Sequence, residues 1–537
     1  MKKNIIIAFI LVLTMLLGAC GGVAPTPPAP QPAESPPMPT HEPAADYAPA
    51  PAPEAVQQFD YYREYDWSAD GESYLFIDEN RETFTEHNSM LTFSLKVDTA
   101  AYTNVQRYIE SGALPPRDAV RTEELINYFR YEEPVRFDDG PFGVYTEVAP
   151  SPFDSSRHIA FVRVKTREVD RRSLPPSNLT FLIDTSGSMS SHDKLPLLKQ
   201  AFGLLVETLG EDDMVSIVTY AGNSSIALDS VSGADKRRIM DTINKLQAGG
   251  STAGGEGIET AYRLAGKNFI EGGNNRVILA TDGDFNVGVS SNAELSRLIK
   301  QKSDSGVYLS ILGFGMGNIR DDLMETLSRD GKGNYSYINS INTAQKVLVD
   351  ELSGNLFTVA DDVKAQIEFN PGNVKSYRLI GYENRAMANR DFDDDSKDAG
   401  SVGAGTDVVV MFEIELNNGN DPNMKYQGQN SEVAVSGNFA DELFEVRIRY
   451  KVPGEQTSKL VTRPVTLGAI RARASADCGF AVAVAMYGSL LRGSEYAKGT
   501  SISKVYSIAE DSLGRDENGY RKEFLNLLRQ CERLLYN

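Results

Sequence analysis

The sequence feature that most constrains the fold is a regular alternation of apolar runs and helical repeats between residues 174 and 356. Four runs in this segment are nearly uniformly apolar: residues 179–184, 214–220, 276–281 and 307–313. Such runs are typical of strands that are covered on both faces of a sheet. The segments between them repeat apolar residues at helical spacing, as in Leu198, Ala201, Phe202 and Leu205. The sequence therefore predicts an α/β domain with a doubly wound, mainly parallel sheet.

The segments on either side of this α/β unit have a different character. Residues 61–173 contain helical stretches such as "TAAYTNVQRYIESG", followed by strands such as "RHIAFVRVKTRE". Residues 357–537 contain further short strands and become helical after Ser475. Because strands of one style lie before and after the α/β unit, we expect this unit to be inserted into a β-rich accessory domain built from both flanks, with helical N- and C-terminal segments.

The first twenty residues indicate where the protein is delivered. Two lysines precede an uncharged run, residues 5–17, which is typical of a signal peptide and shorter than the roughly 20 residues of a membrane span. The tetrapeptide "LGAC", which ends at Cys20, resembles the lipobox of bacterial lipoproteins. The resemblance implies that residues 1–20 are a lipoprotein signal peptide. It also implies that Cys20 carries fatty acids such as palmitate, which anchor the protein to the cell membrane or outer membrane, outside the cytoplasm.

Residues 21–60 are dominated by proline and alanine, a composition that favours an extended, semi-rigid linker. After Cys20 only two cysteines remain, Cys478 and Cys531. The sequence leaves open whether they form a disulfide or are two separate buried thiols.

The charge of the chain bears on its partners. The formal net charge is -20 and the pI is about 4.8. Binding of nucleic acid phosphates needs a basic face, so this balance argues against nucleic acid as the main partner.

Five polar residues are predicted to meet at one edge of the α/β sheet. Asp184, Ser186 and Ser188 follow the first apolar run in "FLIDTSGSMS". Thr252 lies in the glycine-rich stretch "AGGSTAGGEGI", and Asp282 follows the third run in "VILATDGDFN". Doubly wound sheets bind ligands at the carboxyl ends of their strands, at a switch point in the strand order. The five side chains therefore form the candidate site.

The chemistry of this set favours a hard divalent cation. Two carboxylates and three hydroxyls suit Mg²⁺, and also Mn²⁺ or Ca²⁺, better than zinc or copper. With only two carboxylates, the site would leave a position for an outside ligand. Two other kinds of site fit less well, because Ser188 lacks the G-x-S-x-G context of a serine hydrolase and no Lys-Ser or Lys-Thr follows the glycines as in a P-loop.

The pattern Asp-x-Ser-x-Ser, with a loop threonine and a later Thr-Asp-Gly, resembles the metal-ion-dependent adhesion site of von Willebrand factor type A (VWA) domains, and all five positions match. The resemblance implies that Ser186, Ser188 and, in the ligand-ready state, Thr252 bind the metal directly. It implies that Asp184 and Asp282 act mostly through water, and that a carboxylate of a partner protein completes the metal shell. The flanking stretches "TFSLKVDTAAYTNVQRYIESGALPP" and "DCGFAVAVAMYGSLLRGS" resemble bacterial lipoproteins of the YfbK-like type.

These observations lead to one expected function and two alternatives. We expect a surface-anchored lipoprotein, not an enzyme, whose cation site binds a protein that presents an Asp or Glu. The alternatives are an envelope scaffold or assembly factor with a structural metal site, and a metal-dependent hydrolase, for which the sequence offers no base. We further expect Asp184 to be ionised at neutral pH and, without a cation, to repel Asp282 with nothing to compensate.

Overall fold

The structure is a computed structural model that describes residues 66–67, 71–138, 140–170, 173–251, 254–283, 292–417 and 439–536. The predicted signal peptide, Cys20 and the linker up to residue 60 lie outside these residues, and so does Thr252. Within the described part of the chain, no helix is both long and apolar enough to span a bilayer.

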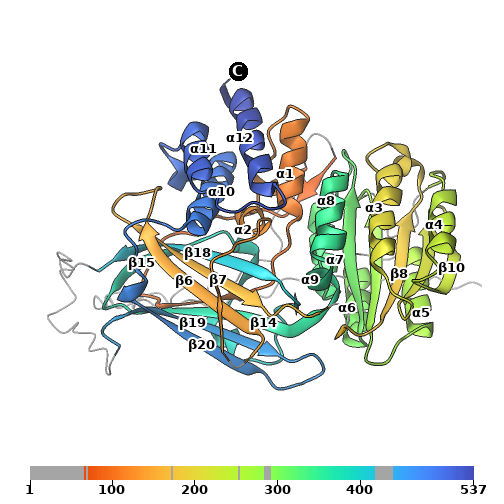
Figure 1. Ribbon diagram of the computed structural model, residues 1–537, viewed down its shortest axis with the longest axis horizontal. Helices are drawn as coiled ribbons and strands as arrows, with labels where there is room; N and C mark the ends of the chain where they lie inside the picture. Colours follow the sequence, from red (N-terminus) through yellow and green to blue (C-terminus); the bar gives the residue numbers. More distant parts are fainter. Residues whose placement is uncertain are drawn as a thin grey trace, which may run out of the picture. The chain divides into compact units, whose positions relative to one another are not determined.

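A six-stranded sheet in the order β10-β9-β8-β11-β12-β13 forms the centre of the α/β unit (Figure 1). Its strands are β8 (Ser177–Asp184), β9 (Met214–Tyr220), β10 (Ser224–Ser232), β11 (Asn274–Thr281), β12 (Val307–Phe314) and β13 (Tyr335–Ile338). All neighbours are parallel except β10, which pairs antiparallel with β9. The predicted α/β fold class is therefore confirmed, and the two outer strands, β10 and β13, add to the four predicted ones.

Helices cover both faces of this sheet. They are α3 (Leu195–Thr208), α4 (Lys236–Lys245), α5 (Gly254–Lys267), α6 (Asn292–Asp304), α7 (Asp321–Asp330), α8 (Ile341–Gln345) and α9 (Leu352–Leu356), with a π-helical turn, Lys346–Asp350, before α9. Phe181 and Ile183 of β8 share one core with α3, α4, α8 and α9. Leu182, which points to the other face, shares a second core with α5, α6 and α7. Because both faces are covered, an uninterrupted apolar strand is the stable choice at the centre.

Two further six-stranded sheets form a β-sandwich. The first contains β16 (Ala386–Met387), β4 (Met90–Ser94), β14 (Thr358–Phe369), β19 (Glu442–Lys451) and β20 (Lys459–Thr466) in that order, with β17 (Val402–Gly403) beside β14. The second contains β3 (Thr83–Phe84), β15 (Val374–Ile380), β18 (Asp407–Leu416), β7 (His158–Thr166), β6 (Phe142–Pro150) and β5 (Arg136–Phe137). Side chains from both sheets, such as Phe93, Ile367 and Phe412, form the core between them.

Each sheet of the sandwich takes strands from both flanks of the α/β unit. In the first sheet Ser94 of β4 pairs with Lys364 of β14, and in the second Val162 of β7 pairs with Val410 of β18. The α/β unit is thus inserted into a sandwich that both flanks build, as expected from the sequence. Its last residue, Leu356, accepts a hydrogen bond of 3.2 Å from Arg276 on β11, at the sheet end where β8 begins. The limits 61–173, 174–356 and 357–537 themselves stay predictions.

Five helices cover the outer face of the second sheet: α1 (Ala100–Glu110), α2 (Thr122–Asn127), α10 (Ala476–Arg492), α11 (Ile502–Asp511) and α12 (Tyr520–Tyr536). These helices lie together above β6, β7 and β18 (Figure 1). Their core includes Phe161 and Met411 of the sheet. Cys478 and Cys531 are buried in this layer as free thiols, which settles the question of a disulfide. Short 3-10 helices connect the larger elements at Arg117–Ala119, Gly187–Ser190, Glu383–Arg385, Asn389–Phe392, Leu467–Ala469 and Glu495–Ala497.

The N-terminal flank also contacts the α/β unit directly. Two short strands, β1 (Asp66–Trp67) and β2 (Ser73–Tyr74), pair antiparallel, and Ser73 forms a bridge with Arg320 in the loop between β12 and α7. Arg121, immediately before α2, forms an ion pair of 2.5 Å with Asp321 at the start of α7. These contacts fasten the flank near the edge of the sheet that carries the candidate site.

Candidate metal centre

The candidate site lies where the strand order changes direction. From β8 the chain passes to β9 on one side and later to β11 on the other, so the carboxyl ends of β8 and β11 enclose the switch point. Asp184 is the last residue of β8, and Asp282 follows the last residue of β11. The structure therefore brings these two residues, which are far apart in the sequence, to the same edge.

Asp184 is fully buried, and both of its carboxylate oxygens are held by protein groups. Oδ1 accepts a hydrogen bond of 2.8 Å from the backbone N–H of Ser186. Oδ2 accepts from the hydroxyls of Tyr220 and Thr281, each at 3.2 Å. These donors fix the carboxylate behind the serines.

Burial is the main influence on the ionisation of Asp184. It raises the pKa of this carboxyl group to about 6, against the lowering effect of the hydrogen bonds from Ser186, and the nearby charge of Asp282 adds to the increase. The group is thus mainly ionised at neutral pH.

Ser186 and Ser188 bring two hydroxyls together at the surface of the site. Their Oγ atoms are 2.9 Å apart. Ser186 precedes the 3-10 turn Gly187–Ser190 and is buried, whereas Ser188 is exposed. The site therefore opens to solvent on the side of Ser188.

The glycine-rich loop before α5 reaches this turn. The N–H of Gly249 donates to the carbonyl of Thr185 over 2.8 Å, and the N–H of Gly187 donates to the carbonyl of Gly250 over 3.0 Å. Thr252, the predicted third hydroxyl, follows two residues after Gly250 but lies outside the described residues. The hydrogen bonds of Gly249 and Gly250 place this loop beside the turn that carries Ser186 and Ser188.

Asp282 has a cationic partner that the sequence did not reveal. The Nζ atom of Lys194 lies 2.8 Å from Asp282 Oδ2 and donates a second, longer hydrogen bond of 3.4 Å to Asn318 Oδ1. Burial opposes ionisation of Asp282, but the hydrogen bond and charge of Lys194, together with hydrogen bonds from Ser188 and Asn318, hold its pKa below the usual value. Asp282 is therefore ionised.

The prediction of an uncompensated repulsion between the two carboxylates is wrong. Lys194 neutralises Asp282, so that Asp184 alone contributes an excess negative charge. The only sequence signal for this ion pair was the position of Lys194, immediately before α3 and close to the serine motif. Its partners Asp282 and Asn318 lie 88 and 124 residues away in the sequence.

The described donors fit a hard divalent cation. Two hydroxyl oxygens stand 2.9 Å apart with two ionised carboxylates close behind them, and oxygen donors of this kind are those that Mg²⁺, Mn²⁺ and Ca²⁺ prefer. Among the described residues, no cluster of three or more His, Cys, Asp or Glu side chains could hold a metal. A site at this edge would thus depend on the serine hydroxyls.

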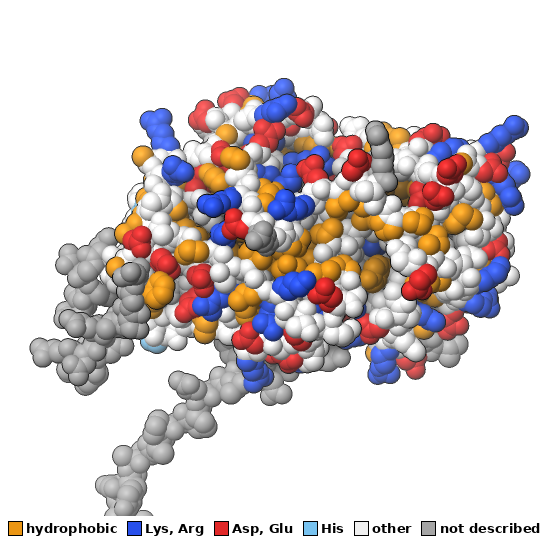
Figure 2. Space-filling view, turned by 60° about the horizontal axis from the view of Figure 1, so that its bottom comes forward, with side chains coloured by type: hydrophobic (Ala, Val, Ile, Leu, Met, Phe, Trp, Pro, Cys, Tyr) orange, Lys and Arg blue, Asp and Glu red, His pale blue; other side chains and the backbone are white. Residues whose placement is uncertain are grey.

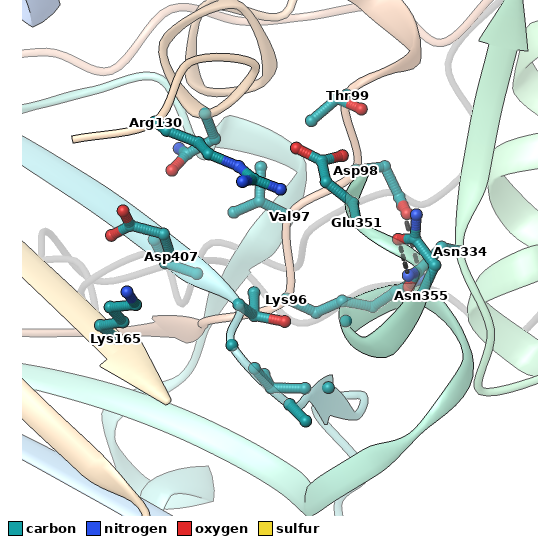
Figure 3. Close-up of a pocket in the computed structure, with 18 of the residues that line it drawn as sticks. Lys96, Val97, Asp98, Thr99, Arg130, Lys165, Asn334, Glu351, Asn355 and Asp407 are labelled. Atoms are coloured by element: carbon teal, nitrogen blue, oxygen red, sulfur yellow. Dashed lines mark hydrogen bonds and ion pairs between the residues drawn. The ribbon is translucent and has the colours of Figure 1, made fainter. Parts of the chain in front are cut away.

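A cavity of about 400 Å³ lies elsewhere, between the α/β unit and the flanks. Figure 3 shows Arg130, Lys165 and Asp407 on one side of it and Asn334, Glu351 and Asn355 on the other. Its polar groups largely satisfy one another, since Lys165 pairs with Glu168 at 2.8 Å and Asn334 donates to Asn355 over 2.9 Å. None of the described site residues lines this cavity.

Comparison with protein-family models finds three matches. Residues 178–350 match the von Willebrand factor type A domain, and residues 68–160 match a model described as von Willebrand factor. Residues 354–534 match the C-terminal region of the uncharacterized protein YfbK. The α/β unit is therefore a VWA domain.

Comparison with individual proteins extends the likeness over most of the chain. The uncharacterized protein YfbK of Escherichia coli K12 is 43% identical over 462 residues, which cover 85% of this chain and 80% of that protein. The uncharacterized protein sll0103 of Synechocystis is 30% identical over 179 residues, 33% of this chain and 41% of that protein. Among solved structures, a von Willebrand factor type A protein from Catenulispora acidiphila matches with a TM-score of 0.41 and 16% identity, over 74% of this chain and 91% of that one. With 43% identity over four fifths of a relative, this chain belongs to the YfbK family of VWA-domain proteins.

Proposed function

We propose that this chain is a lipid-anchored envelope protein whose VWA domain binds a protein partner through a divalent cation, and that an Asp or Glu of the partner completes the cation's shell. The observation that carries the proposal is the pair of hydroxyls of Ser186 and Ser188, 2.9 Å apart. Ser188 is exposed to solvent, and Asp184 and Asp282 are buried behind the pair.

The residues of the site would hold the cation in two different ways. Ser186 and Ser188 would bind the cation directly, and Thr252 would join them in the ligand-ready state. Asp184 and Asp282 would hold it through water, because Asp184 already accepts three hydrogen bonds and Asp282 is paired with Lys194. When bound, Mg²⁺, or Mn²⁺ or Ca²⁺ in its place, would attract an external carboxylate. Because both aspartates would act through water, they would neutralise the charge of the cation less than direct carboxylate ligands would.

A binding role, and not catalysis, suits the groups at this site. Its described side chains are hydroxyls and carboxylates, and the one amine, that of Lys194, is held between Asp282 and Asn318. A hydrolase would need a base poised to take a proton. His192, four residues after Ser188, is exposed.

Protein, and not nucleic acid, suits the surface. On the face seen in Figure 2, acidic and basic side chains are intermixed and no continuous basic area is visible. Together with the net charge of -20, this supports a partner that does not present a row of phosphates.

The decisive experiment measures thermal unfolding of the protein with Mg²⁺ and with EDTA. At a hundredfold excess over Kd, the cation should stabilise the parent by about 2–3 kcal/mol. Asp184→Asn, which can still accept the Ser186 N–H, should remain folded but lose the shift. Asp229→Asn alters an exposed carboxylate of the same domain and should keep it. Identical melting of parent and Asp184→Asn, with and without cation, would refute the site.

A pull-down from envelope extract separates adhesion from a structural metal site. If the cation mediates binding, EDTA should release the partner, and Thr252→Ala should weaken retention while still binding metal through the two serines. If the cation stabilises the fold but Thr252→Ala retains the partner fully, the site is structural, as in a scaffold or assembly factor.

The lipid anchor has its own test. Cys20→Ser should leave the protein unprocessed or release it from the membrane, because the acylated thiol is removed. Partitioning of mutant and parent into detergent measures this. Unchanged retention of the mutant would contradict lipidation.

A further inference from the structure

Lys194 reaches the candidate metal centre from the start of a neighbouring helix. Its backbone stands at the N-cap of α3, without a side-chain hydrogen bond to that helix. Its side chain instead crosses to the end of the neighbouring strands, where Nζ lies 2.8 Å from Asp282 Oδ2 and 3.4 Å from Asn318 Oδ1. The side chain is 9% exposed, so this ion pair is hardly screened by water.

The path of Lys194 is built into the loop after β12. Gly315 has a φ of +75°, and a Cβ there would overlap the methylene carbons of Lys194. The carbonyl of Gly315 accepts a hydrogen bond of 2.7 Å from the hydroxyl of Tyr337, and the N–H of Gly317 donates to Glu72 over 2.9 Å. The loop that makes room for the lysine is thus held at two points, Gly315 and Gly317.

The ammonium group changes the charge of the candidate metal centre. Asp184, Asp282 and Lys194 together carry one excess negative charge. A divalent cation would turn this into one excess positive charge, which a single partner carboxylate would neutralise. Without Lys194 the loaded centre would already be neutral, and its attraction for a carboxylate would be weaker.

We propose that Lys194 is the residue that adapts this centre to a carboxylate ligand, at the expense of metal affinity. Its charge repels the cation and occupies one oxygen of Asp282, so it weakens metal binding. The same charge leaves the loaded centre positive, so it strengthens binding of the partner's Asp or Glu. The inference rests on the proposed function. It makes a prediction that the metal site alone does not make: removing the charge of Lys194 should strengthen metal binding and weaken carboxylate binding.

The experiment compares the parent with Lys194→Met, which keeps the apolar stem and removes the charge. Calorimetric titration with Mg²⁺ should show about tenfold or more tighter metal binding in the variant. The carboxylate is probed with acetate on the Mn²⁺-loaded protein, where it displaces metal-bound water and lowers the water proton relaxation rate. The variant should need at least about ten times as much acetate as the parent for the same decrease in the relaxation rate.

Three further variants complete the design. Lys194→Arg retains the charge and should leave acetate binding close to that of the parent. Lys267→Met breaks an exposed pair with Asp229 on the same domain and should change neither affinity. If Lys194→Met does not fold, Lys194→Gln, which keeps a polar contact for Asp282, takes its place with the same expectations.

The outcomes separate the two proposals. If the parent binds metal but the uncharged variant leaves both affinities unchanged, or shifts both in the same direction, the role of Lys194 is overturned. The proposed function is then left intact. A parent that binds neither Mg²⁺ nor Mn²⁺ overturns the proposed function, and this inference with it.

Discussion

Among single residues, Gly315 shows how closely the loop after β12 is fitted to Lys194. We expect Gly315→Ala to destabilise the protein by roughly 1–3 kcal/mol, because the new Cβ needs a left-handed backbone and overlaps the lysine stem. Gly317→Ala is the matched control, since its φ is +92° but nothing lies within 4 Å of the added carbon. Urea unfolding of both variants measures the difference, and equal losses would contradict the role of Lys194 in filling this space.

The polar residues of the site could be predicted from the sequence only where they stand next to a strand end. Asp184 ends one apolar run, with Ser186 and Ser188 shortly after it, and Asp282 follows another. The topology of a doubly wound sheet therefore brings them together. Lys194, Tyr220 and Asn318 complete the same site through contacts that depend on the folded loops. Tyr220 ends a predicted strand and Asn318 lies outside the predicted strands, and no spacing in the sequence connects either with Asp184 or Asp282.

At the level of secondary-structure elements, β2 and the residue before it tie the N-terminal flank to the loop of the site. Glu72 pairs with Arg107 at 2.8 Å and accepts the N–H of Gly317 at 2.9 Å. Burial opposes ionisation of Glu72, but Arg107, with Tyr74 and Gly317, lowers its pKa from 4.5 to about 2. A carboxylate with a lowered pKa stabilises the fold above its unfolded pKa, and this stabilisation is lost as the pH falls towards 2.

Glu72→Gln should therefore have a pH-dependent effect. At pH 7 the variant should be less stable than the parent, and the difference should shrink by on the order of 3 kcal/mol between pH 5 and pH 2. Chemical unfolding of parent and variant at several pH values measures it. Glu271→Gln, at an exposed position, should show no such trend. A difference between Glu72→Gln and parent that is constant with pH would show that Glu72 does not act as an ion.

Central strands of the α/β sheet were predicted well, and edge strands were missed. The apolar runs at residues 179–184 and 214–220 match β8 and β9 to within two residues. The edge strand β10 was not predicted, because only two of its nine residues are buried and two irregularities interrupt its pairing. The edge strand β20 was missed for a similar reason, since it contains Pro464 and exposes Leu460.

For the molecule as a whole, the α/β unit and its flanks are joined by buried ion pairs. Arg121 contacts Glu124 at 2.6 Å and Asp321 at 2.5 Å, and none of the three side chains is more than 1% exposed. Arg385 adds pairs of 3.2 Å with Asp98 and 3.3 Å with Glu325. Even beside Arg121, burial raises the pKa of Asp321 to about 6, which indicates how strongly these carboxylates depend on their partners.

Arg121→Met should destabilise the whole protein strongly. Removing one partner leaves Glu124 and Asp321 buried without a countercharge, a change that costs about 3–5 kcal/mol. Arg237→Met, at a position whose side chain is 91% exposed, should cost less than about 0.5 kcal/mol. Urea unfolding followed by fluorescence measures both. Similar stability of the two variants would mean that the interface does not depend on its buried charges.

The insertion also bears on the order in which the chain assembles during synthesis. Ser94 and Lys364 are neighbours in the first sheet of the sandwich, yet the entire VWA domain is made between them. Closing so long a loop is entropically unfavourable, whereas the VWA domain has all its strands within one continuous stretch. We therefore expect the VWA domain to fold while β4 still awaits β14 and β7 still awaits β18. Once folded, the VWA domain shortens the effective distance between the two halves of the sandwich. A mutation in the VWA core should therefore delay folding of the sandwich, although the mutated residue is not part of it.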